Sequence, residues 1–164
     1  MSDCKTCAQK EAICTEAVCP VCGSKGIIVP TETVQALIKN NDAHPALTYK
    51  LCTTPGCNIS YFSCGEVFFE LGEMNVSIWF KKSKNKYTVC YCRDIELNHI
   101  IQTVKALNGI KDKQEILKYL GKEKQVHSEC LHKNPTGVTC DKLFYNAIEY
   151  AYKLFTEQNN VNNT

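Results

Sequence analysis

The distribution of cysteines constrains this chain more than any other feature. Its 164 residues contain 12 cysteines. The first residues, MSDCKTCAQKEAIC, are polar and lack the apolar stretch of a signal peptide. In a reducing cytoplasm, cysteines at this density indicate metal ligands rather than disulfide bonds. A secreted disulfide scaffold is the alternative, and the helical patterns in the second half of the chain count against it. We therefore expect a cytoplasmic metal-binding protein.

The overall composition narrows the class further. Hydrophobic residues make up 44% of the chain, which is enough for a folded core. Charged residues make up 22% and the net charge is only +2, so the basic surface typical of nucleic-acid-binding proteins is not indicated. No apolar run reaches the roughly 18 residues of a membrane-spanning helix, so we expect no membrane insertion.

Two closely spaced cysteine pairs in the first half predict a zinc site. The segment CPVCG has the form of a tight metal-binding turn, and Gly23 supplies the conformational freedom that this turn needs. In the second pair, four residues including Pro-Gly separate the cysteines. Four thiolates around one tetrahedral ion suit structural zinc, and such a cage leaves no open position for catalysis. Iron in the same cage is an alternative, as is Cys64 in place of one ligand. This first quartet consists of Cys19, Cys22, Cys52 and Cys57.

A second set of cysteines has a different spacing. In YTVCYC the two cysteines are two residues apart on an extended segment, so both thiols face the same side. In CLHKNPTGVTC the two cysteines enclose a Pro-Thr-Gly loop, and a helical pattern follows. Backbone N–H groups at loop–helix boundaries stabilise negatively charged sulfur, which suits an iron–sulfur cluster. A second zinc ion and a redox-active dithiol remain alternatives. This second quartet consists of Cys90, Cys92, Cys130 and Cys140.

The hydrophobic pattern changes from strand-like to helical near residue 82, which indicates an α+β protein. Strands are predicted in the first part, with one short helix at residues 30–40, from the segments LTYKLC (47–52), ISYFS (59–63), VFFE (67–70) and NVSIWF (75–80). The polar segment KKSKNK (81–86) is predicted to be a linker. Three helices are predicted after it: Asp94 and Asp112 are the candidate N-caps of the first two, and the third starts at Cys140 or Asp141.

These patterns predict the following organisation. Residues 1–17 form a cysteine-containing extension, residues 18–82 a small zinc-ribbon-like β unit, residues 87–157 a helical [2Fe-2S]-binding unit, and residues 158–164 a disordered tail.

The motifs together resemble a known family. The order CPVCG, LCTTPGCNISYF, VCYC and CLHKNPTGVTC resembles the N-terminal domain of CopZ-type copper chaperones over about residues 18–155. The second half is also similar to the bacterioferritin-associated ferredoxin fold, although that family has a shorter second cysteine pair. The resemblance implies that the first quartet binds one zinc ion and that the second quartet binds a [2Fe-2S] cluster.

The resemblance also implies a function. It predicts a one-electron carrier that reduces or helps deliver copper, with copper ions and a copper chaperone or copper-exporting ATPase as partners. Two alternatives stay open: a redox- or iron-sensing interaction module, and a [2Fe-2S] ferredoxin whose partner is unrelated to copper. The sequence contains no nucleophile–base pair and no phosphate-binding loop. Enzymatic activity would therefore be limited to reduction of Cu(II).

Four cysteines remain outside the two quartets. Cys4, Cys7 and Cys14 lie in the polar extension, where a CxxC pair is a weak signal for a soft ion such as Cu(I). Cys64 is expected to be a small buried side chain near the zinc unit. The methionine-containing copper-binding loop that longer CopZ-type proteins carry has no counterpart in this sequence.

Overall fold

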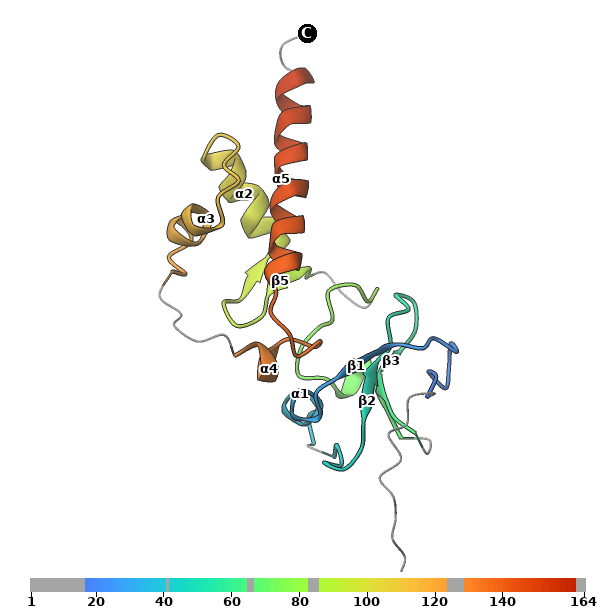
Figure 1. The fold of residues 1–164 in the computed structure, drawn as a ribbon. Helices are drawn as coiled ribbons and strands as arrows, with labels where there is room; N and C mark the ends of the chain where they lie inside the picture. Colours follow the sequence, from blue (N-terminus) through green and yellow to red (C-terminus); the bar gives the residue numbers. More distant parts are fainter. Residues whose placement is uncertain (1–16, 41, 65–66, 83–85, 124–128, 162–164) are drawn as a thin grey trace, which may run out of the picture.

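The computed structural model describes residues 17–161, except for residues 41, 65–66, 83–85 and 124–128. The described part consists of a half that contains a sheet and a half that contains most of the helices (Figure 1). We call them the sheet half (residues 17–82) and the helical half (residues 86–161). The short helices α1 and α4 lie next to each other where the two halves meet.

The sheet half contains a four-stranded antiparallel sheet in the order β1-β2-β3-β4. Its core contains Tyr49 and Tyr61, both fully buried, together with α1 residues such as Val34. Short strands suffice here because their β-branched and aromatic side chains pack in one core with the buried side chains of α1. The elements are β1 (Ile27–Val29), α1 (Thr31–Leu37), β2 (Tyr49–Leu51), β3 (Ile59–Phe62), β4 (Phe68–Glu70) and the 3-10 helix η1 (Leu71–Glu73).

The helical half has a separate core. Helices α2 and α5 pack along each other, and the second cysteine quartet lies in the same cluster of buried side chains. The elements are β5 (Thr88–Cys90), β6 (Ile95–Glu96), α2 (Leu97–Ala106), α3 (Lys113–Tyr119), α4 (Cys130–Lys133) and α5 (Asp141–Val161).

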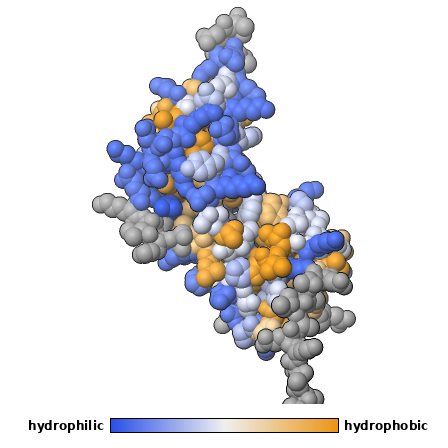
Figure 2. Space-filling model, in the orientation of Figure 1, coloured by the Kyte–Doolittle hydropathy of each residue, from blue (hydrophilic) through white to orange (hydrophobic). Residues whose placement is uncertain are grey.

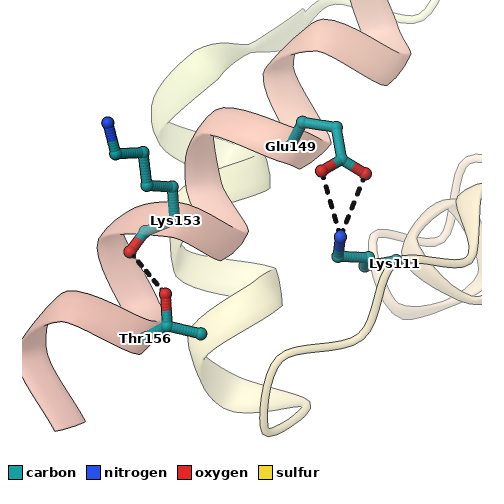
Figure 3. A network of polar contacts seen from close by, with 4 residues as sticks. All are labelled: Lys111, Glu149, Lys153 and Thr156. Carbon is teal, nitrogen blue, oxygen red and sulfur yellow. Dashed lines mark hydrogen bonds and ion pairs between the residues drawn. The ribbon is translucent and has the colours of Figure 1, made fainter. Parts of the chain in front are cut away.

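The turn after α2 is fixed against α5. Gly109 has a φ of +85°, and a Cβ at this position would come within 2.7 Å of the Phe155 ring. Lys111 then reaches Glu149 on α5, with its Nζ 3.0 Å from one carboxylate oxygen (Figure 3). One turn further along α5, the Thr156 hydroxyl donates to the Lys153 carbonyl at 2.9 Å. The turn thus contributes both apolar and polar contacts to the same helix.

Most predicted elements are present in the structure. The α+β class, the strands at 47–52, 59–63 and 67–70, and the short helix after Pro30 are all confirmed. Asp112 caps α3 as predicted, since its Oδ1 accepts a hydrogen bond from the Glu115 N–H at 2.8 Å. Gly121 follows α3 with a φ of +64°.

Three predictions about elements need correction. Residues 75–80 are not a strand, because this segment pairs with the side chain of Tyr91 rather than with the sheet. Asp94 does not cap a helix: it has a φ of +50°, and α2 begins at Leu97 after Glu96. β1 was not predicted. Helix α5 extends to Val161, past residue 158 where the sequence predicted a tail.

The surface differs between the two halves. On the face shown in Figure 2, the helical half is mainly hydrophilic, while apolar areas gather on the sheet half. Exposed apolar side chains of the sheet half include Val21 and Ile28. None of the described helices has the length and apolar character needed to cross a membrane.

Candidate metal centres

The first quartet is assembled from two tight turns. In the first turn, the Gly23 N–H donates to the Cys19 carbonyl at 2.9 Å, and Gly23 has a φ of +69°, which a side chain would disfavour. In the second, Cys52 directly follows β2 and Cys57 lies two residues before β3. The antiparallel sheet therefore brings the second turn beside the first.

The sulfur atoms of the first quartet form a compact group. Cys19 Sγ lies 3.7 Å from Cys57 Sγ, and Cys22 Sγ lies 3.6 Å from Cys52 Sγ. All four metal-binding atoms lie within 4.8 Å of one another. Sulfurs bound at about 2.3 Å to one tetrahedral ion are about 3.8 Å apart. The spacing therefore fits a single tetrahedral ion such as zinc.

The surroundings of the first quartet shift the pKa values of its thiols in opposite directions, and burial also raises the pKa of Cys57. Backbone N–H groups of Val21 and Cys22 point to the Cys19 sulfur, although burial still raises the pKa of Cys19 to about 12. Two hydrogen bonds lower the pKa of Cys22 to about 6: the larger effect comes from the Thr54 hydroxyl and the smaller from the Ser24 N–H. Thiols packed this closely cannot all ionise alone, because their charges repel; a bound cation removes that repulsion.

A buried lysine lies beneath the second turn. Only 4% of Lys81 is exposed, and its Nζ donates to the carbonyls of Thr54, Cys57 and Ile59 at 2.9, 3.2 and 2.9 Å. An ammonium group this buried is stable only when its donors are satisfied. Lys81 was predicted to belong to a linker; instead it fixes the turn that carries two members of the first quartet.

The second quartet is brought together from distant parts of the chain. Cys90 ends β5, Cys92 lies in the turn that follows, Cys130 begins α4, and Cys140 directly precedes α5. All four are buried, with 8% exposure or less. Cys90 Sγ and Cys92 Sγ are 3.5 Å apart. Among the described residues, only the first quartet has all its metal-binding atoms within 4.8 Å of one another, so the second quartet is wider.

The thiols of the second quartet interact electrostatically. A hydrogen bond with the Cys140 thiol, helped by the Arg93 backbone N–H, lowers the pKa of Cys90 to about 5. The same interaction raises the pKa of Cys140 far above its ordinary value. Burial, followed by the charge of Cys90, raises the pKa of Cys92 to about 12. Burial and mutual repulsion thus oppose ionisation of all four thiols together, and a bound cation would remove that repulsion.

The loop between Cys130 and Cys140 is shaped by its own asparagine. Asn134 is buried, and its Oδ1 accepts hydrogen bonds from the backbone N–H and the hydroxyl of Thr136 at 3.0 and 2.9 Å. Its Nδ2 donates to the Val138 carbonyl at 2.9 Å. Asn before Pro is a known turn signal, and the Asn134 side chain closes the tight turn that the Asn-Pro-Thr-Gly sequence indicates.

The structure thus places the sulfurs of the first quartet in one compact group and the four cysteines of the second in one buried cluster. Cys64 belongs to neither: it is half-buried rather than a fully buried side chain. Cys4, Cys7 and Cys14 lie outside the described residues. Lys81 was missed because it follows an aromatic run at the start of a basic segment, where a solvated loop is the usual outcome.

Comparisons with known proteins define the class first. Residues 16–75 match the zf_CopZ family model, described as a zinc binding domain. That segment includes the entire first quartet and ends before Lys81. The segment is therefore similar to a CopZ-type zinc-binding domain, and it contains a group of four cysteines.

Comparison with solved structures then identifies a similar fold. The chain is similar to the X-ray structure of the Archaeoglobus fulgidus CopZ N-terminal domain, with a TM-score of 0.59 and 24% sequence identity. The match covers 77% of this chain and 93% of that one. A search of curated proteins finds no match. The resemblance to CopZ-type N-terminal domains is confirmed, whereas the likeness of the second half to bacterioferritin-associated ferredoxin stays a prediction.

Proposed function

We propose that this chain is a CopZ-type metalloprotein that binds zinc at the first quartet and a [2Fe-2S] cluster at the second, and carries single electrons to copper. The observation that carries the proposal is the convergence of four buried, free cysteines from two loops about 40 residues apart in sequence. Buried cysteines that form no disulfide and lie beside one another are expected to bind a metal, because their mutual repulsion otherwise opposes ionisation.

The donor set of each quartet fits its proposed metal. Mutually adjacent sulfurs suit one zinc ion. The second quartet offers one pair at 3.5 Å within a wider group of four. A dinuclear cluster takes its ligands as two pairs, one on each iron, so its four sulfurs need not all be neighbours. When bound, such a cluster supplies one-electron chemistry, and burial of its ligands limits access of water.

The copper part of the proposal rests on the family resemblance. In that interpretation the reduced protein gives one electron to Cu(II), and the resulting Cu(I) passes to a copper chaperone or a copper-exporting ATPase. Cys4 and Cys7 are the proposed temporary ligands for Cu(I), because paired thiolates favour this soft ion.

Anaerobic purification with metal analysis tests the metal content. We expect about two iron atoms, two acid-labile sulfides and one zinc ion per chain, with visible absorption from sulfur-to-iron charge transfer. Cys130→Ser should weaken or abolish the absorption and keep the zinc. Cys14→Ser, a cysteine outside both quartets, is the matched control. A colourless protein with two zinc ions after iron–sulfide reconstitution would overturn the electron-carrier proposal.

Electron transfer to copper needs its own assay. The protein is reduced anaerobically and mixed with Cu(II) in the presence of a Cu(I)-specific chromophore. We expect one Cu(I) for each electron that the protein loses. Comparison with a Cys4→Ser/Cys7→Ser variant separates reduction of copper from its retention: the variant should reduce Cu(II) normally but release Cu(I) faster. Absence of any Cu(I) would favour a ferredoxin with a partner unrelated to copper.

A further inference from the structure

The loop between Cys130 and Cys140 is held from outside the helical half. The hydroxyl of Tyr61, on β3, donates to the Pro135 carbonyl at 2.8 Å, and the Tyr61 side chain is fully buried. Burial raises the pKa of Tyr61 well above its ordinary value, so the hydroxyl stays protonated and remains a donor. The hydroxyl of Thr33, on α1, donates to the Leu131 carbonyl at 2.6 Å. Both donors belong to the sheet half.

Packing reinforces these hydrogen bonds. Helix α4, which carries Cys130, packs against α1 (Figure 1). Gly137 lies so close to α1 that a Cβ on it would come within 2.5 Å of Thr33 Oγ1 and 2.7 Å of Pro30 Cδ. A four-residue helix has little stability of its own, so its position depends on the surface that it contacts.

The other cysteine pair has a tether of the same kind. Tyr91 lies between Cys90 and Cys92, and its hydroxyl donates to the Ser77 carbonyl at 2.7 Å. The same hydroxyl accepts from the Trp79 N–H at 3.2 Å, and the two rings are 6.4 Å apart. Residues 77–79 belong to the sheet half. Each pair of the second quartet is therefore connected to the sheet half through a tyrosine hydroxyl.

We infer that the sheet half is the scaffold that positions the second quartet, with Tyr61 and Tyr91 as positioning residues, one for each cysteine pair. The inference rests on the proposed function in that it treats the second quartet as a metal site. Loss of either hydroxyl leaves backbone groups unpaired and allows one pair of sulfurs to move relative to the other. The metal should then be lost faster, although no ligand has been changed.

Three conservative substitutions test the inference. Tyr61→Phe and Tyr91→Phe each remove one tether. Tyr49→Phe is the matched control: Tyr49 is fully buried in the same core, but its hydroxyl pairs with the His44 N–H at 2.8 Å, within the sheet half. Each full-length protein is purified anaerobically, its zinc content is measured, and loss of visible absorption is followed in the presence of an iron chelator.

We expect the two tether variants to lose visible absorption roughly three to ten times faster than the wild type, as for one lost hydrogen bond. All variants should keep one zinc ion per chain, and Tyr49→Phe should decay at the wild-type rate. Decay rates of the tether variants no greater than that of Tyr49→Phe would overturn the inference.

A second readout does not require a cluster. Once the iron has been removed, or directly if the protein binds none, alkylation of the second quartet is followed by mass spectrometry in the zinc-containing chain. Tyr61→Phe should speed alkylation of Cys130 and Cys140 beyond the Tyr49→Phe control. Tyr91→Phe should do so for Cys90 and Cys92. Rates equal to the control overturn the inference, whereas an iron-free wild type with the expected alkylation pattern overturns only the proposed cluster.

Discussion

The two cysteine quartets are assembled over different distances along the sequence. The first is built from two turns that a hairpin-like sheet brings together, and Cys22 is exposed at its edge. The second is fully buried, and its pairs come from loops that are separated in sequence by β6, α2 and α3. A site formed by local turns needs little beyond its own segment, whereas a site formed by distant loops depends on everything that positions them.

This difference implies a one-way dependence between the sites. The sheet half contacts both loops of the second quartet through Thr33, Tyr61 and residues 77–79. The first quartet receives its supporting contacts from within the sheet half, Lys81 included. Disruption of the first site should therefore also disrupt the second site. Disruption of the second site should leave the first site intact.

The largest expected effect comes from removing one ligand of each site. Structural zinc contributes on the order of 10 kcal/mol to the folding of small domains, which matches the whole stability of many of them. Cys52→Ala should therefore lose zinc, unfold the sheet half and lose the second metal as well. Cys130→Ala should lose only the second metal. Metal analysis with limited proteolysis checks both variants.

The opposite result would contradict this dependence. If Cys52→Ala kept its visible absorption, the helical half would hold its site unaided. If Cys130→Ala lost zinc, the two halves would instead fold as one cooperative unit.

A smaller effect is expected from the buried lysine. Lys81→Met keeps the apolar stem but leaves the carbonyls of Thr54, Cys57 and Ile59 without their donor. We expect a loss of about 3 kcal/mol in the free energy of unfolding, together with faster zinc release. Lys82→Met is the matched control, because Lys82 is exposed and its backbone N–H still bonds to Pro55. Urea denaturation measures both, and equal stabilities would show that the buried ammonium contributes nothing.

The sequence predicted what depends on nearby residues. The CPVCG turn, the strands at 47–52, 59–63 and 67–70, and the cap at Asp112 all follow from spacing and side-chain type within a few positions. The grouping of cysteines into two sets also followed from spacing. The zinc-binding domain is supported by comparison, whereas the [2Fe-2S] cluster stays a prediction.

What the sequence did not predict depends on distant contacts. The partners of Tyr61 and Thr33 lie 74 and 98 positions away, so no local pattern indicates them. Residues 75–80 have strand propensity, but Tyr91 takes their backbone groups instead of a neighbouring strand. Lys81 belongs to a segment with the composition of a linker, but its side chain is buried like that of a core residue. In each case tertiary contacts override the local preference.

A further test concerns the close approach between the halves. Gly137→Ala places a methyl group against Thr33 and Pro30 at a φ of +70°, so strain and a clash act together. We expect a loss of about 2 kcal/mol and faster loss of the second metal. Gly121→Ala separates the two causes, since Gly121 has a φ of +64° but no atom within 4 Å of the added Cβ. It should cost about 1 kcal/mol and leave metal release unchanged. Equal metal release from both variants would mean that strain alone, not contact with α1, accounts for the effect.

The smallest loss of stability is expected from substitution of Lys111, a lysine at the surface of the helical half. Lys111 pairs with Glu149 and lies 4.0 Å from the centroid of the Tyr152 ring, but 45% of its side chain is exposed, against 4% of Lys81. Water and salt screen such a pair, so Lys111→Met should cost about 0.5 kcal/mol. A double-mutant cycle with Glu149→Gln should give a coupling of similar size that shrinks as salt is added. A coupling as large as the effect of Lys81→Met would mean that the α2–α5 contact depends on charge as strongly as the zinc-binding turn does. The difference between the two lysines would then no longer follow from burial.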